Sequence, residues 1–463
     1  MDLVSKLWGF CNKLRHDGVD PADYIEQLTY LLFLKMAEEK AIPVPSEYNW
    51  NSLIIKNNDE VLKHLDAILN KLKHESGILG DIFSEPVSRV RNSHILKSLI
   101  KEIDTIHWTA YDADVVGLAF EELIGKVANE GKKGAGQYFT PRPLIQAIVE
   151  VMKPNPFESK NFKISDEAVG TAGFLVVASE WFKENIGIKT LTKLQLNYLK
   201  NCTYFGQELV QRPRRLALMN MFLHDINAQI KLGDTIYGIP DNNSYSCILL
   251  NPPFGTKGAN QIPNREFPVK TSDKQLNFIQ HIIEKLETGG RAAIVLPDSC
   301  LSSEASKKIW SHYLDKKKSK KNVCRVHTII KLPEGIFAAY ANGVRACVIF
   351  LEKGKELETM WMYDCRKNIQ KITTKSNTLK LEHFEDFISN YGIDPNGYSE
   401  RKETERFLPH TLMEIRNKEF DLSFTEVFKP LPLQHPTEII NQMIEDYQSK
   451  IEMLLKLKNK LPK

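Results

Sequence analysis

Hydrophobic residues recur at spacings of three and four through the first 130 residues, which is the pattern of helices that bury one face. The stretch 24–40, YIEQLTYLLFLKMAEEK, shows it most clearly, and 96–104 and 115–129 repeat it. Glycine, lysine and proline then dominate 129–143, NEGKKGAGQYFTPRP, which marks a boundary. We therefore expect a helical amino-terminal domain over residues 1–130.

A different pattern follows, in which short apolar runs alternate with amphipathic stretches. The predicted strands lie within 162–174, 203–209, 246–250, 290–299, 326–333 and 345–354. Alternation of strands and helices predicts an α/β fold, a Rossmann-like and mostly parallel sheet with helices on both faces. Such sheets bind ligands at the carboxyl ends of their strands. We expect this domain to span 131–370. Residues 371–463, where the strand signal fades, form a carboxy-terminal region that ends in a helix.

Composition narrows the class of protein only slightly. The chain has 463 residues, a formal net charge of +4 and seven widely spaced cysteines without a Cys-x-x-Cys pair. These features argue against a disulfide framework and against a structural zinc site. No apolar run approaches the roughly 20 residues of a membrane span, and the first residues lack a signal-peptide core. We expect a cytoplasmic protein of several domains that has no metal site.

The turn after the first predicted sheet strand contains Gly170 and Gly173. Glycines let a backbone approach a ligand, although a lone G-x-x-G is also common in ordinary tight turns. Neither the dinucleotide spacing G-x-G-x-x-G nor a P-loop is present. Glu208 and Asp234 end the next two strands, where acids can accept hydrogen bonds from ribose hydroxyls and an adenine amino group. Together these features predict a cofactor that carries a nucleoside.

The fourth strand, SCILL, ends on Asn251, Pro252, Pro253 and Phe254. An exocyclic amino group of a nucleobase is a poor nucleophile because its lone pair is delocalised into the ring. The side-chain oxygen of Asn251 and the carbonyl of Pro252 could accept its two N–H bonds and free that lone pair. Prolines fix the backbone so that the acceptors are preorganised, and Phe254 offers a face for stacking. A rigid turn that caps a strand is the structural alternative.

The chain resembles the modification (M) subunit of type I restriction–modification systems. GQYFTPRP, DEAVGTAGFL, GQEL, GDT and NPPFG occur in the order seen in amino-group DNA methyltransferases that carry the cofactor loop first. The amino-terminal helical segment and the stretches GGRAAIVLPDSCL and KLPEGIFAAYANGVRACVIFLEKG are also similar to that family, so the likeness covers residues 1 to about 370. It implies methylation of adenine at N6 with S-adenosylmethionine as the methyl donor.

The resemblance assigns roles to residues at matching positions. A loop over the methionine end of the cofactor would consist of Gln137, Tyr138, Phe139, Thr140, Pro141 and Arg142. The cofactor backbone, ribose and adenine would contact Asp166, Gly170, Thr171, Ala172, Gly173, Glu208 and Asp234. The flipped target adenine would be held by Asn251, Pro252, Pro253 and Phe254.

Two positions depart from the family pattern. The turn usually reads Asp-Pro, whereas here Glu167 follows Asp166, which leaves the rigidity of the turn in question. An acid often lies five residues before the asparagine, and here that position is Ser246. The four residues assigned to the target adenine are all present.

Base readout requires a domain that we do not find after the closing strands. The resemblance implies that double-stranded DNA is recognised by a separate specificity (S) subunit bound to two M subunits, and that a restriction (R) subunit joins for cleavage. The segment 255–274, with Lys257, Arg265, Lys270 and Lys274, is either a phosphate-contacting loop or a solvated surface loop. KKKSKK at 316–321 favours a solvated loop.

The predicted tail helix carries an apolar stripe. This favours packing against a partner, such as a helix of the specificity subunit, over packing against its own domain. The residues of the stripe are Ile440, Met443, Ile444, Tyr447, Ile451, Leu454 and Leu457. Two other functions stay open. One is a free-standing RNA or protein-amide methyltransferase, since guanine and glutamine amino groups suit the same motif. The other is a scaffold that binds cofactor and DNA without turnover.

Overall fold

The computed structural model describes residues 3–130, 140–240, 242–254, 262–263, 265–319, 321–337, 343–367, 369–373, 376–424 and 448. The chain forms two compact units, Met1–Leu422 and Ser423–Lys463. The stripe predicted for the tail helix lies outside the described residues. The three-part division at residues 130 and 370 stays a prediction.

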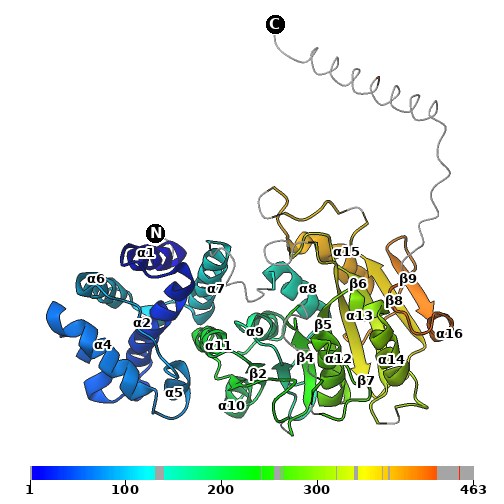
Figure 1. Cartoon of the computed structure of the whole chain (residues 1–463), viewed down its shortest axis with the longest axis horizontal. Helices are drawn as coiled ribbons and strands as arrows, with labels where there is room; N and C mark the ends of the chain where they lie inside the picture. Colours follow the sequence, from blue (N-terminus) through cyan, green and yellow to red (C-terminus); the bar gives the residue numbers. More distant parts are fainter. Residues whose placement is uncertain are drawn as a thin grey trace. The chain divides into compact units, whose positions relative to one another are not determined.

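Residues 3–130 fold into helices, drawn in blue to cyan in Figure 1. They are α1 (Leu3–His16), η1 (Pro21–Asp23), α2 (Tyr24–Glu39), η2 (Ser46–Tyr48), α3 (Trp50–Ile54), α4 (Asn58–Leu72), α5 (Ile78–Ile82), α6 (Ser93–Asp104), η3 (Trp108–Ala110) and α7 (Ala113–Glu130). This confirms the helical amino-terminal region that the periodic pattern predicts. The side chains of Asn49, Asn57 and Asn92 accept backbone N–H bonds at the starts of α3, α4 and α6.

Helix α2 differs from the prediction of a single buried face, because nearly all of its residues are buried. It contacts α1, α3, α6 and α7 and also α11 (Gln211–Leu223). Its buried polar residues are paired: Glu26 with Arg215, and Lys35 with Asp104 at 3.0 Å. A helix surrounded in this way has no solvent face, so polar side chains there need partners inside the protein.

In the described part of the chain, nine strands form one mixed sheet in the order β3-β2-β1-β4-β5-β7-β6-β8-β9. Their bounds are β1 (Ile164–Asp166), β2 (Tyr204–Glu208), β3 (Gln229–Leu232), β4 (Tyr245–Leu250), β5 (Leu286–Pro297), β6 (Cys324–Lys331), β7 (Ala346–Lys353), β8 (Thr359–Asp364) and β9 (Phe407–Thr411). The strands from β3 to β5 are parallel, whereas β7 runs antiparallel to both of its neighbours. The chain order reverses between β1 and β4, which makes their carboxyl ends the expected ligand crevice.

Two groups of helices flank the sheet. Helix α8 contacts α9 and α15, and α12 contacts α14; both α8 and α12 also contact β5. The remaining bounds are α8 (Arg142–Met152), α9 (Gly173–Asn185), α10 (Lys193–Asn201), α12 (Lys274–Lys285), α13 (Ser299–Ser302), α14 (Glu304–Tyr313), η4 (Leu381–Phe384), α15 (Glu385–Tyr391) and α16 (Leu412–Asn417). The predicted α/β class is thereby confirmed.

Strand β9 was not expected, because the strand pattern in the sequence fades near residue 371. It pairs antiparallel with β8, and Pro409 lies opposite Trp361. Proline has no N–H to donate to a neighbouring strand. It is therefore tolerated at the edge of a sheet, where one side of the strand has no neighbour. Most of β9 is only half-buried, which explains why its hydrophobic pattern is weak.

Arg215 of α11 joins the sheet to the amino-terminal helices. Its side chain is 1% exposed, pairs with Glu26 of α2 and donates from Nε to the carbonyl of Ile82 at 2.7 Å. The guanidinium carbon also lies 5.1 Å from the ring centre of Tyr30. Removing one partner of a buried ion pair costs about 3–5 kcal/mol, so this contact ties the two parts of the larger unit together.

Candidate active site

The turn after β1 is built from small residues in unusual backbone conformations. Gly170 has φ +52° and Ala172 has φ +67°, both in the left-handed region. Gly173 begins α9, and a Cβ there would lie 3.0 Å from Cδ1 of Ile145. The turn therefore needs small residues at two places, as expected where a backbone approaches a ligand.

Glu208, at the end of β2, reaches back to this turn. One carboxylate oxygen accepts from the backbone N–H of Gly170 at 3.0 Å, and the other accepts from Val210 at 3.0 Å. Burial raises the pKa of Glu208, and burial also holds the pKa of Asp166 well above its usual range. The charges of Glu167 and Glu208 raise the pKa of Asp166 further.

The loop after β3 is shaped by its own side chains. One oxygen of Asp234 accepts from the backbone N–H groups of Ile236 and Tyr237, each at 2.8 Å. The hydroxyl of Thr235 donates to the carbonyl of Glu167 at 2.7 Å, which fixes this loop to the turn after β1. The predicted acid thus lies in a preformed loop, since its hydrogen bonds are local.

Asn251 follows β4 and is 9% exposed. Its amide Nδ2 donates to the hydroxyl of Thr140 at 3.0 Å. Its Oδ1 is buried and has no hydrogen-bond partner among the residues that the structure describes. A buried polar atom without a partner is costly, so an unused acceptor here indicates a place where a ligand donates.

The two residues after Pro252 are held by neighbours. The carbonyl of Pro253 accepts from Nε2 of Gln275 at 2.5 Å. The ring of Phe254 is edge-on to Phe337, with ring centres 5.3 Å apart and planes at 85°. The Pro-Pro-Phe segment is thereby fixed to α12 and to the segment after β6.

A cavity of about 200 Å³ brings these elements together. Its lining consists of Glu167, Ala168, Gly170, Gln207, Glu208, Leu209, Val210, Asp234, Thr235, Ile236, Tyr237, Asn251, Pro253, Lys274 and Phe278. Five predicted site residues therefore share one cavity at the carboxyl edge of the sheet. Predicted residues that the described lining does not include are Thr140, Pro141, Arg142, Asp166, Thr171, Ala172, Gly173, Pro252 and Phe254. Gln137, Tyr138 and Phe139 lie outside the described residues.

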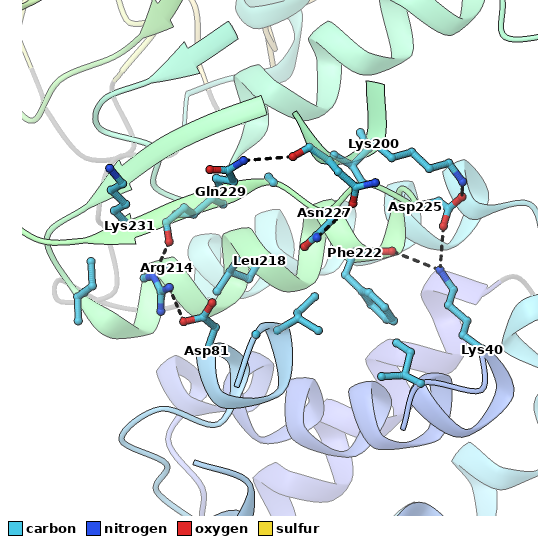
Figure 2. A pocket seen from close by; sticks show the side chains of 18 residues that line it. Lys40, Asp81, Lys200, Arg214, Leu218, Phe222, Asp225, Asn227, Gln229 and Lys231 are labelled. Atoms are coloured by element: carbon cyan, nitrogen blue, oxygen red, sulfur yellow. Dashed lines mark hydrogen bonds and ion pairs between the residues drawn. The ribbon is translucent and has the colours of Figure 1, made fainter. Parts of the chain in front are cut away.

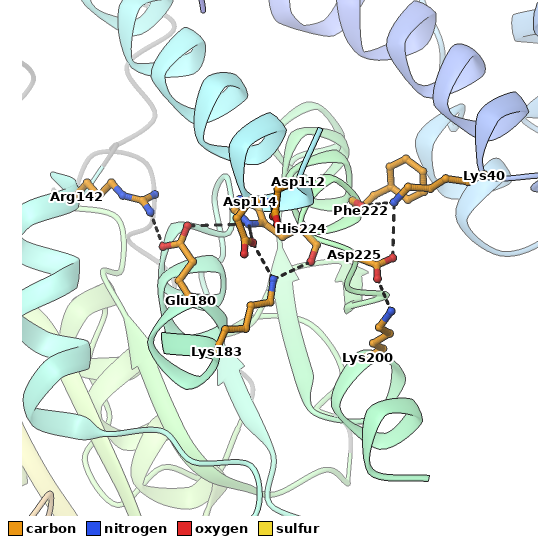
Figure 3. Close-up of polar contacts among 10 residues, drawn as sticks. All are labelled: Lys40, Asp112, Asp114, Arg142, Glu180, Lys183, Lys200, Phe222, His224 and Asp225. Carbon is orange, nitrogen blue, oxygen red and sulfur yellow. Dashed lines mark hydrogen bonds and ion pairs between the residues drawn. The ribbon is translucent and has the colours of Figure 1, made fainter. Parts of the chain in front are cut away.

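Arg142 lies in an ion-pair cluster. It pairs with Glu121 of α7 and with Glu180 of α9, and Figure 3 shows the second pair. Asn220 of α11 donates from Nδ2 to Glu121 at 3.0 Å and to the carbonyl of Thr171 at 3.0 Å. Helix α7 is therefore tied both to the turn after β1 and to the start of α8.

The same cluster continues along α7. Asp114 lies 3.0 Å from Nδ1 of His224 and 2.7 Å from Nζ of Lys183, and Figure 3 shows both contacts. The hydrogen bond from His224 is the main reason that the pKa of Asp114 falls to about 2, although burial opposes it. These contacts fix α7 to α9 and to the end of α11.

Buried polar residues on α12 were missed by the sequence reasoning. Gln275 and His281 are 3% and 2% exposed, and His281 Nε2 lies 3.0 Å from a carboxylate oxygen of Glu167. Burial lowers the pKa of His281, which favours a neutral ring that donates from Nε2 to Glu167. The other oxygen of Glu167 accepts from Ser165 at 2.6 Å. The signal in the sequence is the presence of polar residues at positions of 274–285 that a helix would otherwise fill with buried apolar side chains.

A larger cavity, of about 1080 Å³, lies beside α11 and β3 (Figure 2). Five of its charged side chains are paired with one another: Arg214 with Asp81 at 2.6 Å, and Lys40 with Asp225 at 3.6 Å, while Lys200 also pairs with Asp225. None of the predicted site residues that the structure describes lines it. Its size alone therefore does not make it the active site.

Among the described residues, no group of three or more histidine, cysteine, aspartate or glutamate side chains is placed to hold a metal ion. No helix in the described part of the chain is long and apolar enough to cross a membrane.

Comparison with known proteins agrees with the resemblance. The family model for N-6 DNA methylases matches residues 111–434, and that for the HsdM amino-terminal domain matches residues 3–43. The methylase subunit of the type I restriction enzyme EcoKI from Escherichia coli (strain K12) is 37% identical over 430 residues, which cover 87% of this chain and 78% of that protein.

Solved structures agree with it as well. The crystal structure of the EcoKI M protein is 31% identical, with a TM-score of 0.56 over 91% of this chain and 89% of that chain. A structure from work on complex assembly and conformational transition of the type I restriction–modification system is 26% identical, with a TM-score of 0.75 over 99% of both chains.

The topology of the sheet and the similar solved structures define the class as a Rossmann-like methyltransferase. More particularly, the chain belongs to the N-6 DNA methylase family, as an adenine-specific DNA methyltransferase of the type I methylase-subunit group. The family resemblance, the enzyme class and the fold expected from the sequence are thereby confirmed.

Proposed function

We propose that the chain transfers a methyl group from S-adenosylmethionine to N6 of an adenine flipped out of double-stranded DNA. It acts as the modification subunit of a type I complex. The observation that carries this proposal is the buried Oδ1 of Asn251, which has no partner among the described residues and lies beside a cavity lined by Gly170, Glu208 and Asp234. An acceptor held in that place suits an amino group that donates two N–H bonds.

In the mechanism, Asn251 Oδ1 and the carbonyl of Pro252 accept the two N–H bonds of the adenine amino group. The nitrogen then pyramidalises and its lone pair becomes available for attack. Gln275 holds the carbonyl of Pro253, the residue that follows these acceptors, which supports their preorganisation. Phe254 stacks on the extruded base, which offsets part of the few kcal/mol that flipping costs.

The residues around the cavity suit the cofactor. Gly170, Thr171, Ala172 and Gly173 would approach its backbone, Glu208 the ribose, and Asp234 the adenine amino group, with Asp166 supporting the turn. Gln137, Tyr138, Phe139, Thr140, Pro141 and Arg142 would cover the methionine end. When bound, S-adenosylmethionine supplies an electrophilic methyl group. A cavity of about 200 Å³ is small for it, so the cofactor would extend past the described lining.

Sequence recognition is assigned to a second polypeptide. The relatives are methylase subunits of type I restriction enzymes, and one related structure comes from work on complex assembly of the type I restriction–modification system. We propose that two copies of this chain join one specificity subunit in the cytoplasm, and that a restriction subunit joins for cleavage. The resemblance to methylase subunits of type I restriction enzymes supports this arrangement.

Methyl transfer from labelled cofactor tests the function. The chain is incubated with unmethylated host DNA, host RNA or host protein, each with and without its specificity subunit. We expect label in N6-methyladenine of the DNA, and only when the specificity subunit is present. Label in RNA or protein instead would support the free-standing methyltransferase, and absence of transfer to any substrate would support the scaffold.

A further inference from the structure

An asparagine side chain has one end that accepts hydrogen bonds and one end that donates. Only the accepting end of Asn251 can help an adenine amino group, because two N–H donors facing each other repel. A rotation of the amide by 180° would exchange the two ends with little change in shape. The proposed reaction therefore requires something that fixes the orientation of this amide.

Thr140 contacts one end of this amide. Because a hydroxyl can also donate, the burial of the other end matters as well: a reversed amide would bury the two N–H donors of Nδ2 where a single acceptor now lies. The hydroxyl oxygen of Thr140 accepts from Nδ2 of Asn251 at 3.0 Å, which leaves Oδ1 as the end without a partner among the described residues. Both side chains are 9% exposed, so water has little access to compete for this contact. The donating end is thus satisfied inside the protein, and the accepting end is kept for a ligand.

Thr140 is itself held in place by the residues that follow it. Pro141 has φ −56° and precedes the first residue of α8. Arg142 pairs with Glu121 and with Glu180, the latter pair being visible in Figure 3. The hydroxyl is therefore carried by a short segment that two helices anchor, rather than by a freely moving side chain.

We propose that Thr140 is a positioning residue for methyl transfer: it accepts a hydrogen bond from Nδ2 of Asn251 and so presents Oδ1 to the adenine amino group. This inference rests on the proposed function. It assigns Thr140 a part in orienting the base acceptor, beyond the place in the cofactor loop that the family resemblance implies.

Thr140→Val removes the hydroxyl at nearly constant shape, and Thr140→Ser keeps it. Both are tested in the full complex with the specificity subunit, by single-turnover methylation and by cofactor binding. We expect Thr140→Val to lower the transfer rate about 10- to 100-fold, the effect of losing one buried hydrogen bond. Cofactor Kd and DNA KM should change less than about threefold, and Thr140→Ser should recover most of the rate.

Thr203→Val is the matched control, because the hydroxyl of Thr203 is also buried and donates to the carbonyl of Tyr198 at 3.1 Å. It should lower thermal stability without lowering the transfer rate. A Thr140→Val enzyme with the wild-type rate would overturn the inference, and so would an equal loss in Thr140→Ser. If Thr140→Val mainly weakens cofactor binding, Thr140 serves the cofactor loop and the inference is wrong.

Asn251→Asp gives an independent check. A carboxylate has two equivalent oxygens, so its orientation no longer matters. In that background Thr140→Val should change the rate by less than about threefold, and a loss as large as in the wild type would contradict the orientation argument. Failure of the wild-type complex to methylate adenine would instead refute the proposed function, which keeps the two failures distinct.

Discussion

The two ends of β4 carry polar residues of similar burial and different character. Ser246 near its start is 5% exposed and Asn251 after its end is 9% exposed. Ser246 donates to Glu287 at 3.0 Å and accepts from the backbone of Lys163 at 3.3 Å. Asn251 has one satisfied end and one buried acceptor without a described partner. The two ends are therefore similarly buried but differ in whether their hydrogen bonds are satisfied. We call the end at Ser246 the framework end and the end at Asn251 the functional end.

The absent acid at position 246 lies away from the cavity. Asn251 lies five residues after Ser246. At about 3.3 Å per residue, the two are about 16 Å apart along the strand. Ser246 lies at the edge opposite the cavity and connects β4 to Glu287 of β5. Its departure from the family pattern therefore concerns the framework of the sheet and leaves the chemistry at the carboxyl edge intact.

Asn251→Ala tests the functional end and has the largest expected effect. It removes the acceptor Oδ1, so we expect the transfer rate to fall by about 10²–10³-fold or more, as when one preorganised polar group is removed from an active site. The cofactor should still bind, since Asn251 is assigned to the base. Single-turnover methylation and calorimetric cofactor titration measure both. Loss of cofactor binding would mean that the site has been misassigned.

Glu208→Gln compares two half-buried acids at opposite edges of the sheet. Glu208 would accept ribose hydroxyls, so replacing its charge should weaken cofactor binding about 10-fold or more. Glu287→Gln is the matched control, because Glu287 accepts from Ser246 at the far edge. It should leave cofactor Kd unchanged. Equal effects of the two substitutions would remove the distinction between the edges.

The raised pKa of Glu208 gives this comparison a pH dependence. Burial raises its pKa above the ordinary 4.5, so the folded protein holds this proton at a higher pH than the unfolded chain does. The stability that Glu208 contributes is therefore present below 4.5 and is lost as pH rises through the raised value. Cofactor affinity should change in the opposite direction and weaken on acidification through the same window. In Glu208→Gln both dependences should diminish; a Kd that falls on acidification would contradict the assignment.

Much of this fold could be predicted from local pattern, and the exceptions have physical causes. Strands such as β4 and helices such as α9 (Gly173–Asn185) have strong apolar patterns, whereas β9 is short, half-buried and contains Pro409. The turns that end β1 to β4 are contiguous motifs, so the sequence could identify them. Pairings such as Gln275 with Pro253 join segments that only folding brings together.

Gln275→Met tests one such pairing. It keeps the length of the side chain and removes the hydrogen bond to Pro253, so the Asn-Pro-Pro segment should lose part of its preorganisation. We expect about a 10-fold lower transfer rate in single-turnover assays, with cofactor binding nearly unchanged.

Gln280→Met is the control on the same helix, because Gln280 is fully buried and bonds the backbone N–H and carbonyl of Val269, each at 2.9 Å. It should destabilise the protein without slowing transfer. A Gln275→Met enzyme that reacts at the wild-type rate would show that Pro253 needs no support from α12.

Ser246→Ala should have the smallest effect, because it removes hydrogen bonds at the framework end of β4. We expect a loss of about 1 kcal/mol in the free energy of unfolding and less than a twofold change in transfer rate. Ser246→Asp, which supplies the acid that the family often has, would place a carboxylate beside Glu287 and should destabilise the protein further. Denaturant melts and single-turnover rates measure the two effects separately. Faster transfer in Ser246→Asp would show that this end of β4 communicates with Asn251, which the satisfied contacts of Ser246 give no reason to expect.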